Sequence, residues 1–69
     1  MKTNKKWYAY DNHGSYYKLE GDVLMFSPMF KSGEMDKENI GEIDWERGVE
    51  DGEDRKQMEN IVKELQARI

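Results

Sequence analysis

Two turn segments divide residues 6–30 into three short runs, and this division constrains the fold more than any other feature of the sequence. The runs are rich in tyrosine and other large apolar side chains, which favour strands. They cover residues 6–11, 16–20 and 23–27. The segments between them, residues 12–15 and the pair Gly21 and Asp22, are typical of hairpin turns. The sequence therefore predicts an antiparallel β-meander over residues 6–30.

The registers that the two hairpins imply agree with each other. A two-residue turn in the second hairpin places Leu19 opposite Leu24, and a two-residue turn in the first places Tyr10 opposite Tyr17. Side chains alternate between the faces of a strand, so a slip of one residue in either hairpin would break the agreement. Both registers put the same six side chains on one face: Tyr8, Tyr10, Tyr17, Leu19, Leu24 and Phe26.

An apolar stripe near the end of the chain predicts an α-helix over about residues 52–68. Its residues recur at spacings of three and four, as on one face of a helix. They are Met58, Ile61, Val62, Leu65 and Ile69. Asp51 is the expected N-terminal cap. The spacing of Glu59 and Lys63, and of Glu64 and Arg68, favours two ion pairs along the helix.

The segment between meander and helix, residues 31–51, is predicted to be an acidic turn and strand region. Residues 32–54 carry ten acidic and two basic side chains. Ile43 and Trp45 alternate within residues 40–46, which indicates a fourth strand. The acidity fits a solvated surface, a docking surface for a basic partner, or a divalent-cation site. The docking hypothesis rests on Glu42, Asp44 and Glu46.

The cation hypothesis is the weakest of these three, and we predict no metal site. Residues 36–47 share the glycine at the sixth position with a calcium loop of the EF-hand type. Ile40 and Arg47, however, occupy positions that need oxygen ligands. We interpret the match as chance.

Together these elements predict one α+β domain over residues 1–69. It would contain a three- to four-stranded antiparallel β-meander with one C-terminal α-helix packed on one sheet face. Charged residues make up 38% of the chain, but two Trp, four Tyr and two Phe argue against disorder. A chain this short rarely gains more than ~3–5 kcal/mol from its core. With no cysteine to form a disulfide, self-association is the expected supplement.

The second sheet face is where we expect function. It would expose aromatic and aliphatic side chains beside a lysine, a combination that often marks interaction sites. The residues that we expect to form it are Trp7, Tyr16, Lys18, Val23 and Met25. We therefore predict a small protein-interaction module, most simply a homodimer that associates through this face.

Two alternatives remain: an acidic protein that docks on a basic partner surface, and a binder of single-stranded nucleic acid. Trp7 and Tyr16 would stack on bases and Lys18 would contact phosphate, with Lys2, Lys5 and Lys6 beside them. The net charge of −4 argues against nucleic acid as a partner, because contacts to phosphate dominate the affinity of such binders.

No residue pattern indicates catalysis or a cofactor, and we predict that the protein is not an enzyme. His13 is the only histidine, and beside Gly14 it is expected to form a turn. No nucleophile or phosphate-loop motif is present in the sequence. No apolar run is longer than four residues, the length of residues 23–26, which is too short to span a membrane. No apolar signal segment follows the start, so the expected location is the cytoplasm.

Overall fold

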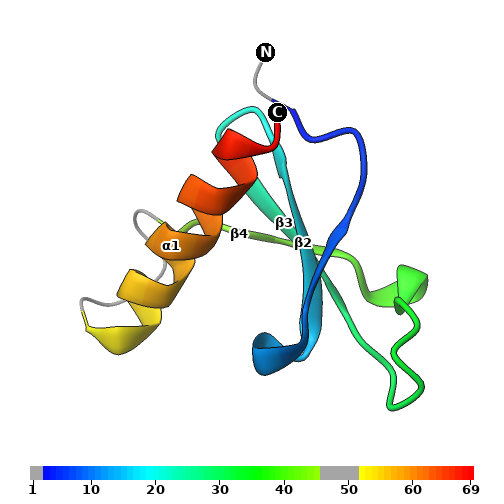
Figure 1. Cartoon of the computed structure of the whole chain (residues 1–69). Helices are drawn as coiled ribbons and strands as arrows, with labels where there is room; N and C mark the ends of the chain where they lie inside the picture. The colour runs from blue at the N-terminus through cyan, green and yellow to red at the C-terminus, as the bar shows by residue number, and fades with distance from the viewer. Residues whose placement is uncertain (1–2, 46–51) are drawn as a thin grey trace.

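In the part of the chain that the structure describes, four short strands form one antiparallel sheet in which neighbours in sequence are neighbours in space, with one α-helix across one face (Figure 1). The computed structural model describes residues 3–45 and 52–69. Its elements are β1 (Tyr8–Tyr10), β2 (Ser15–Glu20), β3 (Val23–Pro28), β4 (Gly41–Ile43) and α1 (Glu53–Ala67). The strand order β1-β2-β3-β4 and the C-terminal helix confirm the predicted α+β meander.

The first hairpin keeps the predicted faces but not the predicted register. Residues Asp11–His13 form a turn of 3-10 helix that ends at Gly14, in the left-handed conformation with φ 63°. This turn takes four residues instead of two, so Tyr17 lies opposite Tyr8 and not Tyr10. Because the shift is two residues, every side chain stays on its predicted face.

The second hairpin has the predicted register, and β4 extends the sheet at its far edge. Leu24 lies opposite Leu19 on one side and Ile43 on the other. Gly41 lies opposite Phe26, and a Cβ at Gly41 would come within 2.6 Å of the Phe26 ring. The glycine therefore allows the Phe26 ring to lie over the edge strand. The fourth strand is shorter than the sequence indicates and ends at Ile43.

The core lies between the sheet and α1. Its six buried apolar residues are Tyr17, Leu19, Leu24, Ile61, Val62 and Leu65. Met58 packs at the margin of this cluster, as the helical stripe predicts. Ile69 does not join it, because α1 ends at Ala67, and the residue is 53% exposed. The predicted cap, Asp51, lies outside the described residues.

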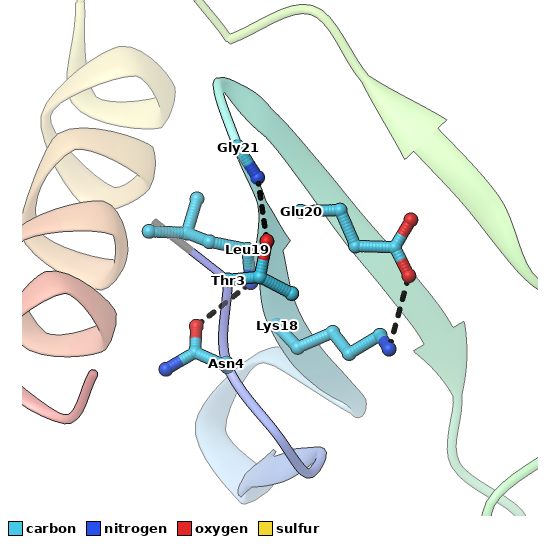
Figure 2. A network of polar contacts seen from close by, with 6 residues as sticks. All are labelled: Thr3, Asn4, Lys18, Leu19, Glu20 and Gly21. Carbon is cyan, nitrogen blue, oxygen red and sulfur yellow. Dashed lines mark hydrogen bonds and ion pairs between the residues drawn. The ribbon is translucent and has the colours of Figure 1, made fainter. Parts of the chain in front are cut away.

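Asn4 joins three parts of the fold and is only 1% exposed. Its backbone N–H donates to the Leu19 carbonyl at 2.9 Å, and its side-chain oxygen accepts from the Leu19 N–H at 2.8 Å (Figure 2). Its side-chain amide donates to the Leu65 carbonyl near the end of α1 at 2.9 Å. The segment before β1 is thus fixed to both the sheet and the helix.

The segment after β3 folds back on the end of the sheet. Met29 bridges to Met35, and the Asp36 N–H donates to the Pro28 carbonyl at 2.8 Å. Phe30, the next residue, lies outside this bridge and is 52% exposed.

The length and polarity of α1 are those of a helix at a protein surface. Within the described ranges, no helix is both long and apolar enough to cross a membrane.

Candidate functional site

The sheet face opposite α1 carries one cross-strand row of three chemically different side chains. Lys18 in β2 lies opposite Met25 in β3, and Met25 lies opposite Glu42 in β4. In the neighbouring row Glu20 lies opposite Val23, a residue that is 37% exposed. The face thus has a cation at one side, a thioether in the middle and a carboxylate at the other side.

Lys18 is held over this face by two neighbours. Its ammonium lies 5.3 Å from the centroid of a Trp7 ring and 3.0 Å from the Glu20 carboxylate. Figure 2 shows Lys18 and Glu20 on one side of β2 and Leu19 pointing to the other side, toward the helix. Contacts of this kind between partly exposed groups contribute only about 0.5–1 kcal/mol each. Lys18 can therefore exchange partners at little cost.

The other end of this face is partly covered by the segment that follows β3. The Tyr16 hydroxyl donates a hydrogen bond to the Gly33 carbonyl. The Ser27 hydroxyl, which belongs to a fully buried residue, donates to the Asp36 carbonyl at 2.6 Å. Tyr16 therefore anchors a loop, which the sequence did not indicate.

We call the part of the face outside this loop contact the open patch. It consists of Trp7, Lys18, Val23, Met25 and Glu42. Four of these five residues were expected from the sequence, and Glu42 was expected as part of an acidic docking surface instead.

The three residues of that acidic surface are only partly described. Glu42 is exposed in β4, and Asp44 is exposed just after it. Glu46 lies outside the described residues.

Asp36, the first residue of the segment that resembles a calcium loop, has a local structural role. Its carboxylate accepts a hydrogen bond from the Glu38 N–H at 3.2 Å and one from the Asn39 side chain at 2.7 Å, which caps a turn of 3-10 helix at Lys37–Asn39. In the described part of the chain, no group of three or more His, Cys, Asp or Glu side chains is placed to hold a metal ion.

A polar cleft of about 470 Å³ lies between the first turn and α1. Its lining includes His13, Asn60, Glu64 and Tyr10. The Tyr10 hydroxyl is buried and has no hydrogen-bond partner within normal geometry among the described residues. Burial, and secondarily the nearby Glu64 carboxylate, raises the pKa of Tyr10 to about 12. The Tyr10 phenol is thus held in its neutral form. His13 lies in the turn before β2, as the sequence predicts.

A second cleft, of about 400 Å³, lies where the segment before β1 meets the end of α1. Its lining is Thr3, Lys5, Lys6, Tyr8, Arg68 and Ile69. The Arg68 guanidinium lies 4.5 Å from the Tyr8 ring centroid, and the Lys6 ammonium lies 5.4 Å from it. The lysines and Arg68 are at opposite ends of the sequence, so no local pattern reveals this cleft.

The fold and these surfaces define a small meander-and-helix α+β domain with one sheet face covered by the helix and one partly open. Comparisons with protein-family models, with curated proteins and with solved structures found no significant match for the chain. The function proposed for the domain therefore rests on the physical character of its surfaces.

Proposed function

We propose that this protein is a small, non-enzymatic interaction module that forms a homodimer through the open patch. The observation that carries the proposal is the row Lys18, Met25 and Glu42, which lies across three adjacent strands. Its two ends have opposite charge and its centre is apolar. A row of this kind is complementary to a second copy of itself.

The row favours one dimer geometry over another. In a face-to-face dimer the two-fold axis lies between the sheets. If that axis is parallel to the strands and passes over Met25, Lys18 of one protomer faces Glu42 of the other, and the pair occurs twice. If the axis is instead perpendicular to the strands, Lys18 of one protomer faces Lys18 of the other. Strands are about 4.8 Å apart and stacked sheets about 10 Å apart, distances that Lys and Glu side chains together can span.

The small core supplies a reason for association. The six buried apolar residues of the core come from one sheet face and one helix. Burying a Val or Met side chain fully contributes about 1.5–3 kcal/mol, so Val23 and Met25 add usefully to a marginal domain. The open patch has only five residues, so the dimer interface would be small, and interfaces that bury little surface usually have low affinity. We expect a dissociation constant on the order of micromolar or weaker.

Sedimentation equilibrium on a charge-swap series tests the proposal. Lys18→Glu and Glu42→Lys each place like charges opposite one another in the dimer, so each single variant should dissociate more readily than the wild type. The double variant Lys18→Glu with Glu42→Lys restores opposite charges and should recover much of the affinity. The control is Lys63→Glu, an exposed charge reversal on α1, which should leave association unchanged.

A wild-type protein that stays monomeric up to submillimolar concentration would overturn the proposal, as would a double variant no tighter than either single. If a monomer instead bound a single-stranded oligonucleotide, with an affinity that fell with salt and was lost in Trp7→Ala, nucleic-acid binding would replace it.

A further inference from the structure

The cleft between the segment before β1 and the end of α1, lined by Thr3, Lys5, Lys6, Tyr8, Arg68 and Ile69, is referred to as the basic cleft. Hydrogen bonds of the backbone fix its walls. Thr3 bridges to Glu20 and Asn4 pairs with Leu19, but β1 begins only at Tyr8. Lys5 and Lys6 therefore stand out from the sheet as exposed residues. Figure 1 shows this segment and the end of α1 at the same end of the molecule.

The charge of the basic cleft differs from that of the whole chain. Three cationic side chains and no acidic side chain line it, although the chain has a net charge of −4. Among residues 3–45 and 52–69, no carboxylate lies within ion-pair distance of Lys5, Lys6 or Arg68. The expected pair of Arg68 with Glu64 is thus absent there, and Arg68 lies over the Tyr8 ring instead.

The Tyr8 ring holds two of the three cations, Lys6 and Arg68, through cation–π contacts. A guanidinium that stacks on an aromatic face keeps its N–H donors in its own plane, where they can bind an oxyanion in a bidentate manner. Arg68 and Lys6 both lie within cation–π distance of this ring. Neither position depends on a competing carboxylate.

Two carbonyl groups at the C-terminal, negative end of the α1 dipole accept hydrogen bonds near the basic cleft. The Leu65 carbonyl accepts from the Asn4 side chain and, at 3.1 Å, from the Arg68 N–H. The Gln66 carbonyl accepts from the Ile69 N–H at 3.4 Å. These donors reduce the partial negative charge that would otherwise repel an anion.

We propose that the basic cleft binds a phosphate monoester that carries an apolar body. The phosphate dianion interacts with Lys5, Lys6 and Arg68, because three cations match two negative charges better than the single charge of a carboxylate. The apolar body contacts Tyr8 and the half-exposed Ile69 side chain. The volume of about 400 Å³ lies within the range of small-molecule sites. This inference is independent of the dimer, because no residue of the open patch lines the basic cleft.

Titration of the isotopically labelled protein with phenyl phosphate, followed by NMR, tests the inference. We expect saturable shifts of the amide signals of Lys5, Lys6, Tyr8, Arg68 and Ile69. Benzoate, with one charge, and inorganic phosphate, without the apolar body, should both bind more weakly. Equal affinity for inorganic phosphate would contradict the role of Tyr8 and Ile69, and equal affinity for benzoate would contradict the preference for a dianion.

Two exposed side chains supply variants that do not disturb the core. Arg68→Gln and Lys6→Gln should each weaken phenyl phosphate binding about fivefold, the equivalent of ~1 kcal/mol. The matched control is Lys63→Gln, which removes an exposed cation of α1 outside the basic cleft. An equal loss in the control, or shifts that stay linear and never saturate, would overturn the inference in favour of general charge attraction.

Discussion

The side-chain amide of Asn4 donates to the Leu65 carbonyl across 61 residues of sequence, while its side-chain oxygen accepts from the Leu19 N–H. One buried amide therefore joins the segment before β1, the central strand β2 and the last turns of α1. Each partner is a backbone group in the interior, where an unpaired polar group is costly. The position of the helix over the sheet, and with it the shape of the basic cleft, depends on this residue.

Replacing Asn4 by Ala should destabilise the domain by about 2–3 kcal/mol, because the Leu19 N–H and the Leu65 carbonyl both lose a buried partner. Urea unfolding measures this loss. Thr3→Ala is the comparison variant, since it removes a longer, partly buried bond of 3.3 Å to Gly21 and should cost less than about 1 kcal/mol. Equal effects of the two variants would show that the Asn4 bonds have no special role.

Gly41→Ala should cost about 1–3 kcal/mol, because the new methyl group meets the Phe26 ring and must displace it. The double variant Gly41→Ala with Phe26→Leu should be less destabilised than the sum of the two single changes, since the smaller side chain leaves room. Denaturant unfolding of the four proteins in this cycle gives the coupling energy. If the two destabilisations were strictly additive, the close approach of Gly41 and Phe26 would not be the cause of the Gly41→Ala effect.

The Tyr10 phenol should make stability fall in alkaline solution. Its folded pKa of about 12 exceeds the ordinary value of 10.0 expected for the unfolded chain. The folded state binds this proton more tightly, so the stabilisation is complete below pH 10 and is lost as the pH rises toward 12. Tyr10→Phe should remove this part of the loss of stability at alkaline pH, as measured by urea unfolding at several pH values.

Glu64→Gln serves as a partial version of the same test. Without the carboxylate the Tyr10 pKa should fall, so the alkaline loss of stability should lie between those of the wild type and Tyr10→Phe. Profiles that run parallel in all three proteins would contradict the assigned cause.

Much of the sheet was predictable because two-residue periodicity fixes which face a side chain occupies. Tyr17, Leu19 and Leu24 are buried as the pattern indicates. The register of the first hairpin was not predictable, because residues 11–13 form a 3-10 turn instead of pairing. A shift of two residues conserves the faces, so the error in register left the face assignment intact.

The contacts between segments far apart in sequence could not be predicted. Asn4 is a polar residue followed by two lysines, and nothing local indicates that it is buried. The Tyr16 bond to Gly33 depends on the path of a loop backbone that has no periodicity. The basic cleft likewise needs Arg68 and Lys6 at the same aromatic ring, which only the packing of α1 brings about.

The most direct test of the central proposal is the concentration dependence of backbone amide chemical shifts in NMR. If the open patch forms the dimer, dilution should shift the signals of Trp7, Lys18, Val23, Met25 and Glu42 together along one binding isotherm, while exposed α1 positions such as Lys63 stay fixed. Shifts that are absent at every concentration, or that occur on α1 and not on the open patch, would contradict it.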